Sequence, residues 1–323
     1  ANAYGHGVKD CLAALSETDA FGVACLEEAL EIRALGFEQP ITLIEGVFTA
    51  DEMSSVIEQK LECVIHHPQQ VDWLLAHKTA YIENKLKVWV KLNSGMNRLG
   101  FKVAEIIDVI NTLKAEGFTC VLAMHFANAD SEQHPLNDQQ REQFLQVKNA
   151  CAPILASCCN SAAIFKWPEL NFDFVRPGIM LYGASPFADK NAHDLDLKPV
   201  MTFTAEIIAL NTIQAGEAVG YGSHFVANNK TELAIVSIGY GDGYPRAFPK
   251  QNYVAIKGQT VPVVGRVAMD MIAIDVTGLN AQLGAKVELW GNTRLVDEVA
   301  EANGTIGYEL LYRLSNRPTR KQI

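Results

Sequence analysis

The chain has 323 residues, of which 49% are apolar and 20% charged, and its formal net charge is −10. This length and composition are typical of a globular protein with two domains. No apolar run approaches the roughly 18 residues that a membrane span needs. Lysine and arginine form no basic block, which a nucleic-acid surface would require. We therefore expect neither a membrane nor a nucleic acid as a partner.

Seven cysteines are irregularly spaced, and two of them, Cys158 and Cys159, are adjacent. They form no CxxC pattern of the kind that binds metal, so we predict no metal site. Reduced thiols of this kind indicate a cytoplasmic protein. The chain opens at Ala1 without a methionine, so a removed signal peptide stays open as an alternative.

The first 190 or so residues alternate short apolar runs with helical patterns. Segments such as Leu26–Leu35, Val103–Leu113 and Gln139–Ala150 repeat apolar residues every three or four positions, as helices do. Strands alternating with helices predict βαβ units and a parallel sheet. The predicted strands are Phe21–Cys25, Ile41–Val47, Cys63–His66, Lys87–Leu92, Cys120–Phe126, Ile154–Cys159 and Phe174–Leu181.

A helical pattern at Val8–Leu15 precedes the first of these runs. We therefore expect one more strand to end just before Ala1. Eight such units make a TIM-like (β/α)8 barrel, whose catalytic residues stand at the C-terminal ends of the strands.

From about Lys198 the sequence becomes rich in β-formers, with glycine-containing turns. Lys257-Gly258-Gln259 is typical of a hairpin tip, and Val296–Ala302 is the one clear helical stretch. The polar stretch Asp189–Asp196 marks the predicted boundary between an α/β domain over 1–196 and a mostly antiparallel β domain over 197–323. The runs that predict its strands are Met201–Leu210, Leu233–Ile238, Tyr253–Ile256, Val261–Val264, Ile272–Val276 and Val287–Leu289.

Polar residues recur where the barrel strands end. Hydroxyl groups and backbone amides suit a phosphate monoester, and arginine and histidine suit a heterocycle or a carboxylate. Each alone also fits packing or a surface position, but their recurrence on the catalytic face of a barrel favours a site. The candidates are Tyr4, Arg98, His125, Asn160, Ser161, Arg176, Gly178 and Ile179.

Other chemistries lack their motifs. The sequence has no acidic cluster for a metal, no GxSxG elbow and no glycine-rich nucleotide loop. The stretch Gly239-Tyr240-Gly241-Asp242-Gly243 lacks the GxGxxG spacing and lies among predicted strands. We predict a tight turn there.

The chain resembles the alanine racemases, a pyridoxal-phosphate-dependent family of fold type III, along essentially its whole length. The motifs follow in register: Ala-Asn-Ala-Tyr-Gly-His-Gly at 1–7, Gly-Met-Asn-Arg-Leu-Gly at 95–100, His-Phe-Ala at 125–127, Asn-Ser-Ala-Ala at 160–163, Arg-Pro-Gly-Ile-Met-Leu-Tyr-Gly at 176–183, Gly-Tyr-Gly at 220–222, Gly-Tyr-Gly-Asp-Gly-Tyr at 239–244, Gly-Arg-Val-Ala-Met-Asp at 265–270 and Gly-Thr-Ile-Gly-Tyr-Glu at 304–309. Position 268 is Ala where many members have Cys, so that cysteine is not required. Asn97 replaces a common Gly, and we expect no catalytic consequence.

The resemblance implies a cofactor pocket. In this family a lysine, here expected immediately before Ala1, forms a Schiff base with pyridoxal phosphate. Arg176 matches the partner of the pyridine nitrogen, His125 would contact the ring, and Asn160 belongs to the same pocket. The implied phosphate-binding residues are Tyr4, Ser161, Gly178, Ile179 and Tyr308.

The resemblance also implies how the proton moves. Tyr221 is the second base, opposite the lysine, and it comes from the other subunit together with Met269 and Tyr240, which meet the substrate. A homodimer with shared active sites follows. Arg98 would steady the substrate carboxylate. Lys91 matches a lysine that some members carry as a carbamate, with an ordinary strand lysine as the alternative.

Asp130, Arg246, Arg266 and Ile306 align with entrance residues, or are surface residues. The implied function is two-base interconversion of L- and D-alanine, which supplies D-alanine for peptidoglycan. A broad-specificity or serine racemase is the alternative. A non-catalytic carrier of the cofactor would lack the β domain, and a related decarboxylase would need a cysteine and aspartate pattern that is missing.

Overall fold

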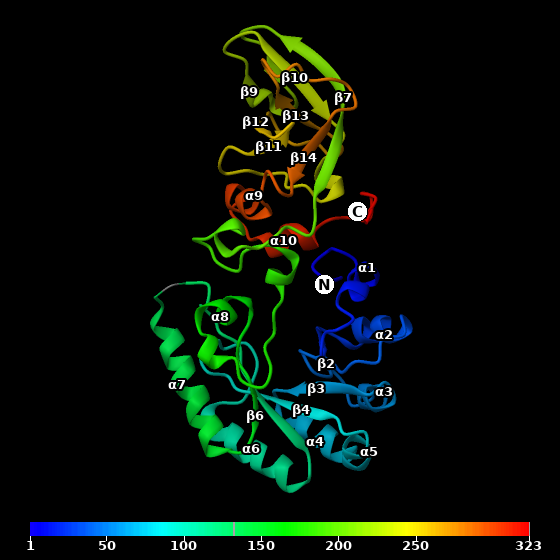
Figure 1. The fold of residues 1–323 in the computed structure, drawn as a ribbon, viewed down its shortest axis with the longest axis vertical. Coiled ribbons are helices and arrows are strands. Elements are labelled where there is room, and N and C mark those ends of the chain that lie inside the picture. Colours follow the sequence, from blue (N-terminus) through cyan, green and yellow to red (C-terminus); the bar gives the residue numbers. More distant parts are fainter. Residues whose placement is uncertain (132, 323) are drawn as a thin grey trace. The chain divides into compact units, whose positions relative to one another are not determined.

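The structure is a computed structural model that describes residues 1–131 and 133–322. The described chain forms two compact units (Figure 1). The first holds Ala1 and Val8–Gly178. The second holds everything from Ile179 onward together with the short segment Asn2–Gly7. The predicted domain boundary after residue 196 stays a prediction.

The first unit is built on a parallel sheet of six strands in chain order. Its strands are β1 (Phe21–Val23), β2 (Ile41–Leu43), β3 (Leu61–Ile65), β4 (Lys87–Lys91), β5 (Thr119–Ala123) and β6 (Leu155–Ser157). Most residues of β2 to β6 are buried, as expected of a parallel sheet that helices cover, whereas none of β1 is. The predicted TIM-like α/β fold is confirmed, in the form of a curled six-stranded sheet.

The predicted seventh strand, Phe174–Leu181, is not a strand. Its backbone makes one isolated parallel bridge, between Asn160 and Arg176, and then turns into the 3-10 helix η2 (Ile179–Tyr182). Pro177 has no N–H group to donate to a neighbouring strand, which interrupts a ladder. Phe174 and Ile179 still pack inward, the Phe174 ring 5.1 Å from that of Trp89, while Val175 and Leu181 are exposed.

The segments between the strands of the first unit form helices, and apolar residues repeat along one face of each helix. In α6, for example, Ile106, Ile110 and Leu113 are fully buried. The helices are α1 (Val8–Ala14), α2 (Leu26–Ala34), α3 (Glu52–Glu58), α4 (Pro68–Ala76), α5 (Lys78–Glu83), α6 (Val103–Ala115), α7 (Pro135–Ala150) and α8 (Ser161–Lys166).

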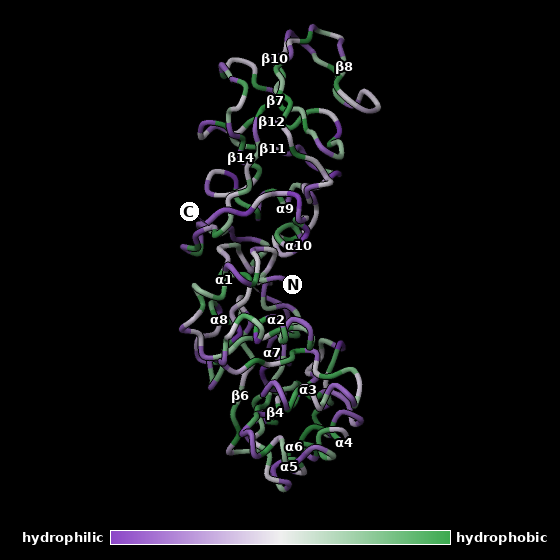
Figure 2. The backbone as a smooth tube through the Cα atoms, turned by 90° about the vertical axis from the view of Figure 1, so that its right-hand side faces the viewer, coloured by the Kyte–Doolittle hydropathy of each residue, from purple (hydrophilic) through white to green (hydrophobic). Residues whose placement is uncertain are grey.

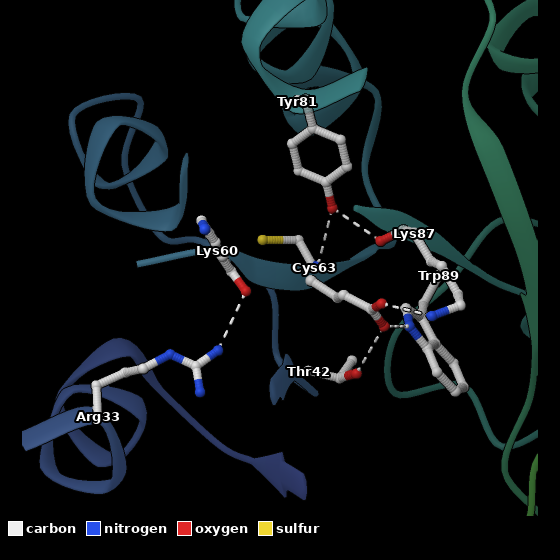
Figure 3. Close-up of polar contacts among 8 residues, drawn as sticks. Arg33, Thr42, Lys60, Cys63, Tyr81, Lys87 and Trp89 are labelled. Carbon is white, nitrogen blue, oxygen red and sulfur yellow. Dashed lines mark hydrogen bonds and ion pairs between the residues drawn. The ribbon is translucent and has the colours of Figure 1, made fainter. Parts of the chain in front are cut away.

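A buried polar network ties the strands together near the N-terminal end of β4 (Figure 3). Glu62 on β3 accepts hydrogen bonds from the Thr42 hydroxyl at 3.3 Å and from the Trp89 indole at 2.7 Å. Its other oxygen pairs with Lys87 Nζ at 2.9 Å. Thr42, Glu62 and Lys87 come from three adjacent strands, so this network fixes the sheet at the end away from Lys91.

The second unit contains a closed six-stranded barrel in the order β10-β13-β12-β11-β14-β7, with antiparallel pairs throughout. Its strands are β7 (Phe203–Ile213), β10 (Thr231–Val236), β11 (Tyr253–Ile256), β12 (Gln259–Val264), β13 (Ile272–Asp275) and β14 (Lys286–Trp290), with a small hairpin of β8 (Ala218–Val219) and β9 (Phe225–Val226). All six predicted strands are present. Along the labelled strands β7 and β14, hydrophobic residues are interspersed with more polar ones, as in strands with one buried face (Figure 2).

Two turn predictions are confirmed. Lys257 and Gly258 have φ angles of 50° and 76°, as a two-residue turn between β11 and β12 requires. The stretch Gly239–Gly243 contains the 3-10 helix η5 (Tyr240–Asp242) and ends at Gly243 with φ of 101°. The predicted helix is α9 (Val296–Asn303), and a further helix, α10 (Gly307–Tyr312), was not predicted.

Within the described residues, we find no helix that is both long and apolar enough to cross a membrane.

Candidate active site

The C-terminal ends of the parallel strands carry a group of cationic side chains. Lys91 is the last residue of β4, and Arg98 lies in the loop that follows it. Asn93 shapes this loop, because its side-chain oxygen accepts the backbone N–H groups of Gly95 and Asn97 at 3.2 and 3.0 Å. Arg98 itself is exposed, so its guanidinium can reach a ligand.

Lys91 is 9% exposed, and burial together with the charges of Arg176 and Arg98 lowers its pKa to about 7. No carboxylate is among the charges that act on it in the described chain. A lysine in this setting is a neutral amine in a large share of molecules near pH 7.

His125 follows β5. Burial, and then Arg176, Lys91 and Arg98, lower its pKa to about 3, so the imidazole is neutral at physiological pH. The positive charge of this region therefore rests on the arginines. Behind His125, the fully buried Gln140 of α7 donates to the His125 carbonyl at 3.0 Å and to the Ser94 hydroxyl at 2.9 Å.

Arg176 is held by both ends of its guanidinium group. Nη2 donates to the Met124 carbonyl at 2.6 Å, and Nη1 donates to the Ser157 hydroxyl. Burial lowers the pKa of Arg176, but an arginine stays protonated. The sheet thus presents a fixed, charged donor.

Ser161 and Gly178 lie together: the Gly178 N–H donates to the Ser161 hydroxyl at 2.9 Å. Asn160 caps α8, since its side-chain oxygen accepts the Ala163 N–H at 3.0 Å. The amide of Asn160 therefore has a structural task in addition to any contact with a ligand.

Tyr4 belongs to the second unit, where its ring lies 5.0 Å from Tyr182 and 5.8 Å from Tyr308. Asn2, Ala3 and Tyr4 all have φ near 50°, a left-handed conformation that non-glycine residues rarely adopt in succession. His6 supports the turn, since its Nδ1 contacts the carbonyl oxygens of Ala3 and Tyr4.

Tyr221, Tyr240 and Met269 lie in the second unit and are 73%, 40% and 53% exposed. The loops that carry the last two are joined, because the Tyr240 N–H donates to the Ala268 carbonyl at 3.1 Å. The four residues aligned with an entrance are exposed: Asp130 in the first unit, and Arg246, Arg266 and Ile306 in the second.

The structure thus groups Lys91, Arg98, His125 and Arg176 on the first unit, beside the pair of Ser161 and Gly178. It groups Tyr4 with Tyr308, and Tyr240 with Met269, on the second. Sequence reasoning missed Gln140, which sits as a polar residue in an amphipathic helix, and also the charged residues Asp242, Asp270 and Arg317 described below. In the described residues no group of His, Cys, Asp and Glu could hold a metal ion.

Known proteins of one family match this chain in both of its units. Residues 1–186 match the family "Alanine racemase, N-terminal domain", and residues 200–322 match "Alanine racemase, C-terminal domain". The chain is 48% identical to the alanine racemase of Psychrobacter sp. (strain PRwf-1), over 100% of this chain and 91% of that protein. The chain therefore belongs to the alanine racemase family.

Solved structures give the same result. The alanine racemase from Acinetobacter baumannii is 77% identical and superposes with a TM-score of 0.98, over 99% of this chain and 90% of that one. The alanine racemase from Bartonella henselae, solved with covalently bound pyridoxal phosphate, is 29% identical with a TM-score of 0.88, over 100% of this chain and 90% of that one.

Proposed function

We propose that this protein interconverts L- and D-alanine with pyridoxal phosphate, as a homodimer in the cytoplasm. The observation that carries the proposal is the pair of cationic side chains Arg98 and Arg176 beside Lys91, whose pKa is lowered to about 7, and a neutral His125, with no carboxylate among the charges acting on Lys91 and His125. These side chains suit a ligand that is an anion with an electron-poor ring. The family match, which extends over both units, also supports the proposal.

The residues present fit the cofactor. Arg176 is fixed through Nη1 and Nη2, and as a permanently charged donor it can bind a pyridine nitrogen that carries no proton of its own. Ser161, Gly178, Ile179, Tyr4 and Tyr308 offer neutral hydroxyls and amides for a phosphate. When bound, pyridoxal phosphate supplies an electron sink for the α-carbon of the substrate.

The chain's own groups orient the substrate and move its proton. Arg98 binds the carboxylate of alanine, and the Met269 backbone amide and Tyr240 contact the substrate bound by the partner subunit. Tyr221 holds the proton on one face of the α-carbon, and the expected lysine handles the other face. Two bases on opposite faces are what an inversion of configuration needs.

Tyr221, Tyr240 and Met269 are exposed in the single chain, which supports their contribution to the site of a partner subunit. Exposed aromatic and methionine side chains of this kind are typical of interfaces. Seven free cysteines support a reducing compartment.

The test is Tyr221→Phe in the full-length protein. We expect racemisation in both directions to fall by about 10³-fold, the usual size of a lost general base, while the absorbance of the bound cofactor is kept. Near-normal turnover of Tyr221→Phe would contradict the assignment. Turnover of alanine should also exceed that of serine, lysine and arginine.

Sharing of sites between subunits has its own test. Two inactive variants, Tyr221→Phe and Arg176→Ala, are mixed under conditions that exchange subunits. If each site takes Arg176 from one subunit and Tyr221 from the other, random mixing restores about a quarter of the wild-type activity, because half the dimers carry one intact site. No recovery in verified heterodimers would contradict sharing.

A further inference from the structure

Two loops of the second unit are joined edge to edge. They are the turn 239–243, which carries Tyr240, and the stretch 268–270, which carries Met269. The Tyr240 N–H donates to the Ala268 carbonyl at 3.1 Å, and the Gly241 N–H donates to the Met269 carbonyl at 2.9 Å. A Cβ atom at Gly239 would overlap the backbone of Ala268 and Met269, so the two loops are packed without a gap.

One arginine from the C-terminal segment connects carboxylates of both loops. Arg317 Nε lies 3.3 Å from Asp242 Oδ1, and Arg317 Nη2 lies 2.8 Å from Asp270 Oδ1. Asp242 is also bonded inside its own turn, where its Oδ2 accepts the Gly239 N–H at 2.9 Å. The guanidinium lies so close to Gly241 that a Cβ atom there would overlap Nη1.

The backbone of the C-terminal segment is fastened at the same place. The Ser315 N–H donates to the Asp242 carbonyl at 3.1 Å, and the Arg317 N–H donates to the Ser315 hydroxyl at 3.2 Å. Arg317 therefore approaches the two loops from a fixed backbone rather than as a free surface side chain.

We propose that Arg317 is a positioning residue for substrate binding: it sets the Met269 amide relative to Tyr240 by joining Asp270 to Asp242. This inference rests on the proposed function, which places Met269 and Tyr240 against the substrate. A single exposed ion pair contributes little. Here, however, Asp242 is 7% exposed, and one planar fork contacts two carboxylates.

Loss of Arg317 leaves Asp242 and Asp270 without their shared counter-charge. Asp270 is adjacent to Met269 in the chain, so the Met269 amide moves when Asp270 turns away. The expected defect is in substrate binding, because neither Tyr221 nor the cofactor-binding residues of the first unit are contacted by Arg317 in the described chain.

The experiment compares Arg317→Ala with Arg313→Ala in the full-length, cofactor-loaded enzyme. Arg313 is a matched control, because it lies in the same segment, is equally exposed and pairs with Glu309 at 3.1 Å. We expect Arg317→Ala to raise KM for both alanine enantiomers about tenfold, the size of one charge-assisted interaction, with kcat changed less than about threefold. Arg313→Ala should leave both constants unchanged.

Two further arms separate positioning from general destabilisation. Amide hydrogen exchange at Tyr240 and Gly241 should become faster in Arg317→Ala and stay unchanged in Arg313→Ala. Asp270→Asn added to Arg317→Ala should lower KM part of the way back to the wild-type value, because it removes an unpaired carboxylate. Arg317→Lys, which keeps charge without the fork, should fall between wild type and Arg317→Ala.

An unchanged KM together with unchanged exchange in Arg317→Ala would overturn the inference. So would a fall in kcat at constant KM. If the wild-type enzyme itself fails to racemise alanine, the proposed function fails instead, and amide exchange still decides whether Arg317 holds the two loops.

Discussion

The carboxylate of Asp297 accepts the backbone N–H of Ser185 through both of its oxygens, at 3.1 and 3.2 Å. One of these oxygens also accepts the Ala192 N–H at 3.0 Å. A single side chain at the start of α9 thus holds the segment that runs from η2 to η3 (His193–Leu195). The segment contains the polar stretch where the sequence predicted a domain boundary.

Asp297 makes the stability of the protein depend on pH. Burial raises its pKa from 3.8 to about 6, so between these values the folded protein binds a proton that the unfolded chain has released. The free energy of unfolding therefore falls as pH rises through this window, by up to about 3 kcal/mol. Urea unfolding at pH 4–7 should show this decline in wild type and in the exposed control Asp138→Asn, and a flatter profile in Asp297→Asn. Parallel profiles would contradict it.

Lys91 should react with carbon dioxide. Its pKa of about 7 leaves a neutral amine, and an anionic carbamate would offset the charges of Arg176 and Arg98. With ¹³C-labelled bicarbonate we expect a carbamate signal by NMR that grows from pH 6 to pH 8 as the amine loses its proton. Lys91→Met should lack the signal, and the exposed control Lys102→Met should keep it. A signal that survives in Lys91→Met would assign it elsewhere.

Asn97 occupies a left-handed position, with φ of 56°, just before Arg98. Alanine is disfavoured there, so Asn97→Ala should lower the free energy of unfolding by about 1 kcal/mol. Asn97→Gly should lower the free energy of unfolding by no more than a few tenths of a kcal/mol, since glycine adopts this conformation freely. Thermal unfolding of the two variants checks the difference, and equal losses would show that the side chain's hydrogen bonds matter more than its backbone angle.

Glu62, on β3, is 3% exposed and bonded to side chains of the two neighbouring strands β2 and β4. Glu62→Leu leaves Lys87 and the Trp89 indole without their acceptor, and should lower the free energy of unfolding by about 2–4 kcal/mol. The double variant Glu62→Leu with Lys87→Met should recover part of the loss. The exposed ion pair of Lys78 with Glu116 gives the control, and Lys78→Met should cost less than about 1 kcal/mol. Similar losses of unfolding free energy at both ion pairs would mean that burial does not determine how much an ion pair contributes to stability.

The sequence predicted what depends on local pattern. Short apolar runs located six strands of the sheet, and runs rich in β-formers located the six strands of the barrel. A strand buried on both faces is apolar throughout, and one buried on a single face alternates apolar and polar residues, so both patterns can be read from the sequence. The strand predicted at Phe174–Leu181 was wrong for a local reason as well. Its apolar residues resemble those of a strand, but Pro177 and Gly178 prevent one. The short helix α10 has only six residues and leaves no periodic pattern.

Some residues of the candidate site could likewise be predicted from the sequence, and others could not. His125 was accessible to prediction because it lies just after a strand, and Lys91 because the family resemblance covers it. Arg317, Asp242 and Asp270 were not, because their importance lies in contacts between segments far apart in the sequence. Gln140 is similar, since only the fold shows that it bonds to the His125 carbonyl.

The segment Asn2–Gly7 has a consequence for the order in which the protein is made. Arg320 donates two hydrogen bonds to the Gly5 carbonyl, which lies 315 positions earlier. During synthesis these first residues leave the ribosome with nothing to pack against, while the sheet of the first unit can already fold. Tyr4 can pack on Tyr308, and Gly5 can bond to Arg320, only after these distant residues have been synthesised. A chain truncated before Tyr308 thus lacks the ring that packs on Tyr4, and the phosphate-binding role that we propose for Tyr4 requires the second unit to be made first.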